Sequence, residues 1–312
     1  MPLATLVFLT ALAAQDSLPD PRPVVLTGAD VPALLGTDPA RLGAMAVRAG
    51  SLVPIPVQVD ERFVYDLATV YRGLDPRDCP RRSWCEDLEG HVVTLGYADP
   101  GTHVGPDPDP ALDADDEIAL MLADFGPRAE TPPAGSVELA ATAGGTTRYA
   151  YLLRERTEAE ALVSFAPGFE RGGYLATYDR GGRDPGRLFN WPFGASSRDR
   201  EANNPETTTV RTAHYEAGFS DRWILSLLRL GGGPDVLDID MIAFGPGVCW
   251  RTPYTGSLSE GGFLVHRAGP VRAIRRVVGF NSGPLVEAEW VFYARYATSA
   301  AHLRVHPVPG VM

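Results

Sequence analysis

The chain of 312 residues contains no lysine, so all 28 of its basic residues are arginine. A phosphate-binding loop of the G-x-x-x-x-G-K-[ST] type needs a lysine, and so does a Schiff-base enzyme. The absence of lysine therefore excludes P-loop ATPases, protein kinases and enzymes that bind pyridoxal phosphate through a lysine. The G-x-S-x-G motif is absent too, so a serine hydrolase of that type is unsupported.

Positive charge is scarce as well, because the net charge is −11 and the isoelectric point is near 5.0. Nucleic-acid binding needs a basic surface that displaces counterions from phosphates, so a nucleic-acid partner is not expected. The acidic balance favours neutral ligands or cations. An acidic polymer would need clusters of arginine to bind.

Long apolar runs are also rare. Leu3–Ala14 is too short to cross a bilayer and ends in Ala11-Leu12-Ala13, which matches a signal-peptidase site. Residues 1–14 are therefore predicted to be a signal peptide, which implies a secreted, extracellular or periplasmic protein. A buried N-terminal helix is the alternative, and the polar, proline-rich sequence that follows disfavours it. No other run is long enough to predict a membrane span.

Only three cysteines are present. Cys79 and Cys85 are close in sequence and predict a local disulfide in an oxidising compartment, with two free thiols as the alternative. A zinc site is disfavoured because no second cysteine pair accompanies them. Cys249 is left over, and the sequence does not decide whether it is free.

Long helical periodicity is scarce, while glycine (33) and proline (28) are frequent. Short apolar or alternating segments between turn residues predict strands. Such segments cover Leu52–Phe63, His91–Ala98, Glu117–Phe125, Ser136–Ala143 and Thr147–Glu155. Asp30–Gly36 is predicted to form a short helix, and Arg222–Leu230 fits either a helix or a strand.

The predicted fold is all-β with few short helices. It is an antiparallel β-sandwich or supersandwich with a smaller N-terminal β domain. The proline-rich stretch Gly126–Gly135 is the best boundary candidate. It separates an N-terminal domain over residues 20–130 from a sandwich domain over residues 136–312, and the latter is expected to be truncated at its C-terminus.

Three consecutive strands are predicted over Gly269–Gly279, Pro284–Tyr296 and Ser299–Val308. Side chains alternate between the two faces of a strand. The last strand therefore places three polar residues on one face, and the middle strand does the same. These residues are His302, Arg304 and His306 on the last strand, and Glu287, Glu289 and Tyr293 on the middle one. An antiparallel meander would gather them on one polar face of a sheet.

Six acids lie between Asp107 and Glu117. An EF-hand is excluded, because neither register from Asp107 or Asp113 supplies the turn glycine at position six. Hard cations also bind in other oxygen-rich loops, so Ca²⁺ is the cofactor to consider. Its candidate ligands are Asp107, Asp109, Asp113 and Asp115. The alternative is a turn rich in aspartate that leads into the following strand.

Two further features invite a functional interpretation. His214 precedes Tyr215, and both residue types can transfer protons. Neighbouring residues on a strand point to opposite faces, so His214 is also consistent with a hydrogen-bonded structural role. The polar stretch from about Arg180 to Pro205 contains Trp191, which is suited to a binding loop, with an unordered surface segment as the alternative.

Four stretches together resemble a group of secreted, largely uncharacterised proteins. They are Pro54–Arg62 with Q-V-D-E, Leu112–Gly126 with D-D-E, Phe244–Phe263, and Gly269–Pro284 with G-P-V-R-x-I-R. More distantly, their order resembles exo-acting rhamnogalacturonan lyase-like proteins of the β-supersandwich type. That resemblance implies a β-sandwich and elimination chemistry on a polysaccharide, and it assigns no catalytic residue.

The leading hypothesis is therefore a secreted carbohydrate-active protein, in its most specific form a lyase of uronate-containing glycans. Elimination needs a base, a group that neutralises the carboxylate and an acid for the leaving oxygen. The catalytic candidates are His302, His306, Arg304, Tyr293 and His214, and the substrate-binding candidates are Trp191, Arg275 and Glu287. The alternatives are a non-catalytic carbohydrate-binding or calcium-stabilised structural module, and a glycoside hydrolase using Glu287 and Glu289.

Overall fold

The computed structural model describes residues 21–67, 93–102, 104–156, 169–175, 208–219, 225–237, 242–244, 249–251, 262–278 and 287–302. Each helix in these ranges is a 3-10 helix of three residues. They span Gly28–Asp30, Pro32–Leu34, Pro39–Arg41 and Leu122–Asp124. The other regular elements are strands that pair in antiparallel sheets. The all-β prediction is therefore confirmed.

The N-terminal half of the chain forms three sheets. A three-stranded sheet has the order β1 (Pro23–Thr27), β7 (Glu117–Met121), β4 (Gln58–Asp60). A four-stranded sheet has the order β3 (Ser51–Pro54), β2 (Gly43–Arg48), β9 (Thr146–Leu153), β8 (Val137–Ala143). A two-stranded sheet pairs β5 (Arg62–Asp66) with β6 (Val93–Tyr97).

The C-terminal half contributes two four-stranded sheets and one small one. The first is β10 (Phe169–Leu175), β11 (Thr208–Thr212), β12 (Tyr215–Phe219), β13 (Leu225–Leu230). The second is β16 (Gly262–Ala268), β17 (Ala273–Val278), β18 (Glu287–Phe292), β19 (Ala297–His302). The small sheet pairs β14 (Ile242–Phe244) with β15 (Cys249–Arg251).

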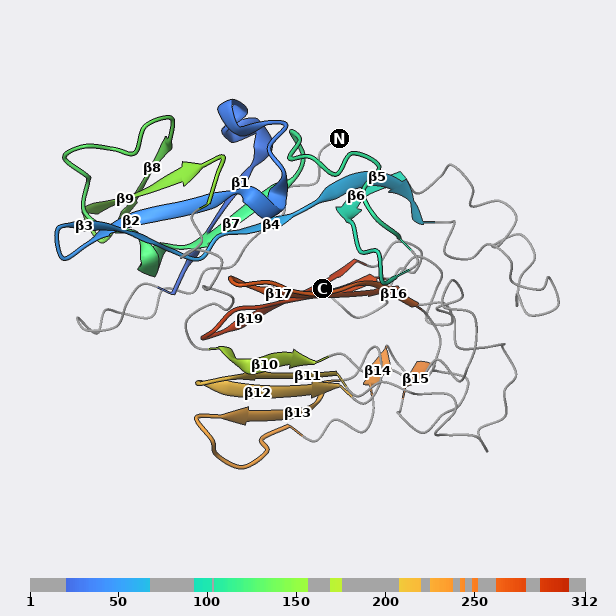
Figure 1. Cartoon of the computed structure of the whole chain (residues 1–312). Coiled ribbons are helices and arrows are strands. Elements are labelled where there is room, and N and C mark those ends of the chain that lie inside the picture. The colour runs from blue at the N-terminus through green and yellow to red at the C-terminus, as the bar shows by residue number, and fades with distance from the viewer. Residues whose placement is uncertain are drawn as a thin grey trace.

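The sheet β16–β19 lies between the N-terminal strands and the sheet β10–β13 (Figure 1). One core cluster joins this sheet to the sheet β10–β13, since Phe219 of β12 packs with Ala273 of β17 and Phe292 of β18. Another cluster joins the sheet to the N-terminal strands through Met121 of β7 and Ile274 of β17. The two faces of β16–β19 are therefore covered by different layers.

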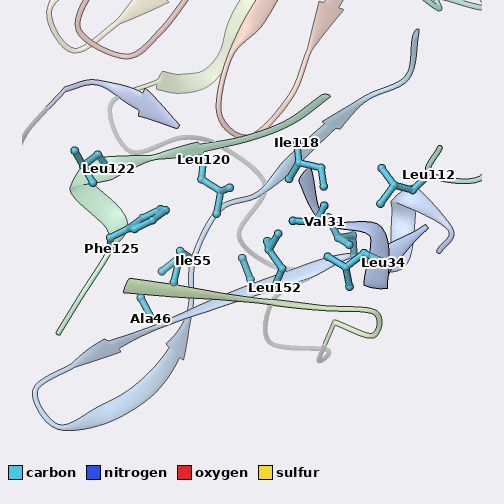
Figure 2. Packing of buried hydrophobic residues seen from close by; sticks show 13 residues of the cluster. Val31, Leu34, Ala46, Ile55, Leu112, Ile118, Leu120, Leu122, Phe125 and Leu152 are labelled. Atoms are coloured by element: carbon cyan, nitrogen blue, oxygen red, sulfur yellow. The ribbon is translucent and has the colours of Figure 1, made fainter. Parts of the chain in front are cut away.

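Strand β7 is buried on both of its faces. Ile118 and Leu120 belong to the core of the N-terminal sheets (Figure 2), while Ala119 and Met121 face the cluster shared with β16–β18. A strand covered on both sides reads as a continuous apolar run, because neither face meets water. This position explains the Glu117–Phe125 segment, whose apolar run contains both large and small residues.

Strands from both sides of Gly126–Gly135 share one sheet. The hairpin of β8 and β9 follows this stretch, and β9 pairs with β2 from Gly43 to Met45. Gly126 itself exchanges backbone hydrogen bonds with Tyr149 of β9. The first group of sheets therefore continues to Leu153, past the stretch that the sequence marks as a boundary.

Candidate functional site: a buried polar network

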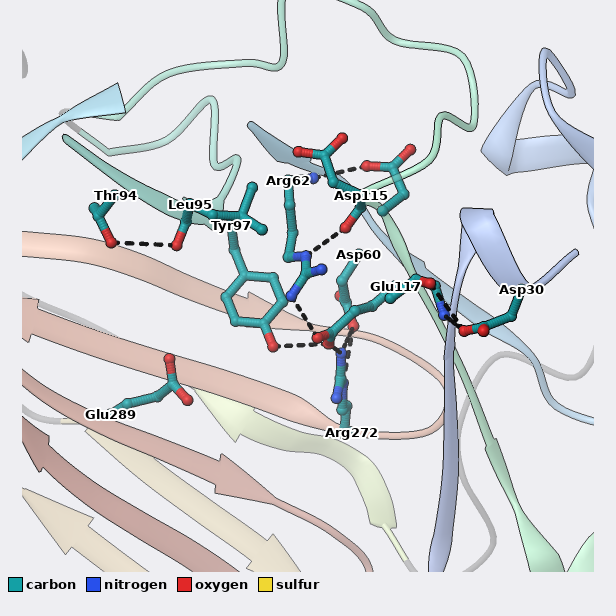
Figure 3. A network of polar contacts seen from close by, with 12 residues as sticks. Asp30, Asp60, Arg62, Thr94, Leu95, Tyr97, Asp115, Glu117, Arg272 and Glu289 are labelled. Atoms are coloured by element: carbon teal, nitrogen blue, oxygen red, sulfur yellow. Dashed lines mark hydrogen bonds and ion pairs between the residues drawn. The ribbon is translucent and has the colours of Figure 1, made fainter. Parts of the chain in front are cut away.

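Three of the segments that carry the family resemblance meet in one polar network (Figure 3). Gln58–Arg62 supplies β4 and the start of β5, Asp115–Glu117 leads into β7, and Gly269–Arg272 precedes β17. Strand β7 pairs with β4, which brings the first two segments together. The turn before β17 then brings the third segment against them.

Arg272 is the centre of this network and is 3% exposed. Its Nε donates to Asp60 Oδ2 at 2.8 Å, and its Nη2 donates to Glu117 Oε2 at 2.6 Å. The side chains of Arg272 and Asp60 are almost completely buried, and that of Glu117 is partly accessible. One guanidinium from the C-terminal half thus bridges two adjacent strands of the N-terminal half.

Glu117 receives two further donors. Arg62 Nη1 lies 2.6 Å from Glu117 Oε1, and the Tyr97 hydroxyl donates to Oε2 at 2.8 Å. Arg62 also donates through Nε to the Asp115 carbonyl at 2.6 Å. Two carboxylates therefore face two guanidiniums, which balances the charge that the layers bury.

Gln58 joins the network to the backbone that carries Arg272. Its Nε2 donates to both oxygens of Asp60, and its Oε1 accepts from the backbone amides of Val271 and Arg272 at 3.1 and 2.9 Å. A Cβ at Gly269 would overlap the Gln58 amide. Glycine is needed there because the turn passes directly over that side chain.

Asp116 supports the network from beside it and is fully buried. Its Oδ1 accepts from the backbone amide of Arg62 at 2.7 Å, and its Oδ2 accepts from that of Asp113 at 2.9 Å. Burial raises the pKa of Asp116 to about 6, although these two hydrogen bonds favour the charged form. The carboxyl holds the acidic loop against the start of β5.

The charges in the network hold one another ionised. Burial of the Glu117 carboxyl would raise its pKa, but Arg272 and Arg62 outweigh burial and keep that pKa below its ordinary value. Burial would lower the pKa of Arg272, and the negative charge of Asp60 raises it instead. The pKa of Tyr97 is raised, chiefly by burial, so its hydroxyl stays neutral and donates.

The C-terminal meander is confirmed, since β17, β18 and β19 pair in order as antiparallel neighbours. The alternation predicted for β18 is also confirmed: Trp290 and Phe292 face the sheet β10–β13, while Val291 faces the N-terminal layer. Glu287 and Tyr293 are both buried. The part of the predicted polar face that Glu287 and Tyr293 form is therefore closed to solvent.

The substrate-binding candidates Arg275 and Glu287 lie in neighbouring strands of one sheet, and their side chains face different layers. Arg275 is fully buried, and its guanidinium lies 4.0 Å from the centroid of the Phe219 ring, on the side of β10–β13. Glu287 is fully buried on the other face, where Arg276 donates to it and also lies 3.8 Å from Glu289. The structure does not bring Arg275 and Glu287 together.

The catalytic candidates are dispersed. Tyr293 is buried next to Arg272, whose hydrogen bond favours the ionised phenol, yet burial dominates and the pKa of Tyr293 is raised. The backbone of His302 pairs with that of Glu287 across β18 and β19. His214 is exposed in the turn between β11 and β12, where its backbone amide donates to Thr212. Arg304, His306 and Trp191 lie outside the described residues, as do Cys79 and Cys85.

The acidic stretch forms a sequence of turns. Asp107 accepts from the amide of Asp109, Asp109 from that of Ala111, and Asp113 from that of Asp115. These are turns closed by an aspartate side chain, as the structural alternative predicted. In the described ranges, no group of three or more His, Cys, Asp or Glu side chains is arranged to hold a metal ion.

Sequence reasoning did not select Arg272, Asp60 or Tyr97 as site residues. A signal for two of them was present, because Asp60 and Arg272 lie within the Q-V-D-E and G-P-V-R segments. Tyr97 had no such signal, since its partner Glu117 comes from another strand.

No helix in the described ranges has the length and apolarity that a membrane crossing requires.

The network is suited to joining layers rather than to proton transfer. Each charged group in it faces an opposite charge, and Tyr97 donates to a carboxylate that is already paired. A general base needs a carboxylate or amine that is free to accept a proton from substrate.

Comparison of the chain with protein-family models, with curated proteins and with solved structures finds no match.

Proposed function

We propose that the protein is a secreted, non-catalytic module that binds carbohydrate on a rigid, layered β scaffold. The observation that carries the non-catalytic part is the closed network around Arg272, in which Asp60 and Glu117 are both ion-paired. Breaking such a buried pair leaves an uncompensated charge. These residues are therefore suited to fixing the layers in place.

The cellular location and the ligand class rest on the sequence. The apolar segment Leu3–Ala14 with its Ala-Leu-Ala end supports export. The resemblance to lyase-like proteins supports a glycan ligand. The acidic net charge favours neutral sugars or a polymer whose carboxylates meet local arginines.

The experiment is a binding titration of the purified protein against polygalacturonate, alginate, chondroitin sulfate and a neutral glucan. Calorimetry measures binding, and near-ultraviolet absorbance of the same samples measures unsaturated sugar products. Heat of binding without a rise in absorbance is the expected result. A protein that binds none of these polymers would contradict the glycan proposal.

A polysaccharide lyase is the second candidate, and it rests on the sequence resemblance to lyase-like proteins. His302, whose backbone pairs with that of Glu287, is the residue that tests it. Histidine is a suitable base for abstraction of a proton beside a uronate carboxylate. A time-dependent rise in absorbance with any uronate polymer, abolished by His302→Ala, would favour this candidate over the first.

A further inference from the structure

Arg276 and Glu289 face each other across neighbouring strands without forming a hydrogen bond. Arg276 of β17 pairs in register with Glu289 of β18, and its Nε lies 3.8 Å from Glu289 Oε2. That distance is beyond the range of a hydrogen bond. Arg276 is 6% exposed, and its Nε is buried without a hydrogen-bond partner. A buried donor left unpaired costs free energy, so this position is suited to gaining a partner.

Glu289 differs from the nearby Glu287 in its access to solvent. Glu287 is fully buried and accepts from Arg276 Nη2, whereas the side chain of Glu289 is 23% exposed. Among the described residues, Arg276 is the one charged group that pairs with Glu289. An ionised carboxylate has about four sites that accept hydrogen bonds. Glu289 is therefore placed to accept hydrogen bonds from the hydroxyl groups of a ligand.

The neighbour of Glu289 on strand β19 is a small residue. Glu289 pairs in register with Ala300, and both Ala300 and Thr298 are exposed. These two residues lie on the same face of the sheet as Glu289, because side chains alternate along a strand and register partners share a face. Since Ala300 presents only a methyl group, a ligand can approach the carboxylate from the β19 edge of the sheet.

Aromatic side chains of the β5–β6 hairpin lie over the same face of the sheet. Tyr65 and Tyr97 pack in the cluster that contains Val291 of β18. Val291 follows Glu289 by two residues and therefore lies on the same face of the strand. In Figure 3 the Glu289 side chain points from its strand toward the Tyr97 ring. Sites for small ligands combine apolar and aromatic surface of this kind with a few polar groups.

We propose that Glu289, with Arg276 behind it, binds hydroxyl groups of a neutral glycan at the β19 edge of the sheet β16–β19. The site rests on the glycan binding proposed above and narrows it to neutral sugars. Glu287, Glu289 and Arg276 together carry one net negative charge, which repels a uronate carboxylate. A sugar that covers Glu289 removes water from its carboxylate, which costs free energy unless an opposite charge is close. Arg276 supplies that charge, and its attraction strengthens as water leaves.

The test is calorimetric titration of the full chain with a soluble β-glucan and a galactomannan, which are neutral, and with polygalacturonate. We expect at least one neutral polymer to bind, and polygalacturonate to bind at least tenfold more weakly. Glu289→Gln should weaken binding of the neutral polymer about tenfold or more, because hydrogen bonds to an ionised acceptor are roughly twice as strong as neutral ones. Its melting temperature should stay close to that of the wild type, since Glu289 is partly exposed and its one ion pair is long.

Matched variants distinguish this site from general effects of charge and bulk. Glu130→Gln removes one exposed acid at the same change in net charge and should bind like the wild type. Ala300→Phe places a ring beside Glu289 and should block binding. Ala301→Phe places the same ring on the other face of β19, next to Ala288, and should leave binding unchanged. Melting temperatures of the two phenylalanine variants show whether both fold.

Equal affinity of Glu289→Gln and the wild type for the neutral polymer would overturn this site and leave glycan binding to another surface. Equal affinity of Ala300→Phe and Ala301→Phe would do the same, and so would binding of polygalacturonate alone. If no polymer binds at all, glycan binding itself fails and this site fails with it. If Ala300→Phe does not fold, the comparison of Glu289→Gln with Glu130→Gln decides.

Discussion

Arg272 provides the sharpest test at the scale of single residues. Arg272→Ala would leave Asp60 and Glu117 buried beside each other without that guanidinium. We expect the free energy of unfolding to fall by about 3–5 kcal/mol, the usual effect of removing one partner of a buried ion pair. Urea denaturation followed by tryptophan fluorescence measures the change.

Arg128→Ala is the matched control for this substitution. Arg128 also pairs with a glutamate, Glu138, but its side chain is mostly exposed. Exposed ion pairs are screened by water and salt, so little change is expected. Equal effects of the two substitutions would show that the network around Arg272 does not stabilise the fold as described.

Asp124 provides a test of pH dependence at the same scale. The side chain is 9% exposed, its Oδ2 has no hydrogen-bond partner, and Arg48 lies 3.7 Å from its other oxygen. Burial raises the pKa of Asp124 above its ordinary value, and Arg48 offsets this only in part. The folded state therefore binds a proton more readily than the unfolded state does.

It follows that Asp124 lowers stability as pH rises from about 4, its unfolded value, through the raised pKa of the folded state. Asp124→Asn removes this loss, so the variant should be at least as stable as the wild type at pH 7. Its advantage should disappear at pH 3. Melting temperatures of both proteins between pH 3 and pH 8 test this, and a variant that is less stable at pH 7 would contradict it.

At the scale of elements, the sequence predicted strands in which apolar and polar residues alternate, but it did not predict which strands pair with one another in a sheet. The two faces of the segment Glu287–Phe292 were visible in the sequence, because Trp290 and Phe292 alternate with Glu287 and Glu289. The structure places the aromatic pair against the sheet β10–β13. The pairing of β9 with β2 had no local signal, since it joins segments far apart in the chain. The proline-rich stretch Gly126–Gly135, predicted as a domain boundary, connects β7 in one sheet to β8 in another.

The sequence led to Arg275, and not Arg272, as a substrate-binding candidate for a related reason: the sequence does not show which layer covers each face of a strand. Arg275 and Arg272 lie three residues apart around the start of β17, so they face opposite layers. Sequence alternation gives the two faces of a strand but not what covers each one. The identity of the site therefore depended on how the layers stack, which no local pattern contains.

Gly126 tests the connection between the N-terminal elements. A Cβ at this position would overlap the Val47 carbonyl, which cannot move without disturbing β2. We expect Gly126→Ala to lower the free energy of unfolding by about 2–3 kcal/mol, in the range of overpacked cores. Denaturation by urea is again the measurement.

Gly144→Ala is the control, because Gly144 lies in the β8–β9 turn at a φ of 57° with open space around it. There alanine meets only the cost of the left-handed conformation, about 1 kcal/mol. A smaller effect at Gly126 than at Gly144 would mean that the Gly126 segment is not packed against β2.

At the scale of the whole molecule, the order of layers predicts where the chain is most stable. Strand β17 has sheet neighbours on both sides, and core clusters cover both of its faces, through Ile274 on one and Ala273 on the other. Strand β13 lies at a sheet edge, and Leu230 at its end is exposed. Amide exchange requires opening, which is least frequent where both faces and both edges are covered.

We therefore expect hydrogen exchange at neutral pH to be slowest in peptides covering β17 and its neighbour β18, and markedly faster in β13. Arg272→Ala should change exchange unevenly across the sheets. It removes the ion pairs that join the residue before β17 to β4 and β7, so exchange should accelerate in β4, β7 and β17, while β11 and β12 change less. Uniform acceleration across all sheets would instead mean that the layers unfold as one unit and that the network does not join two separable parts.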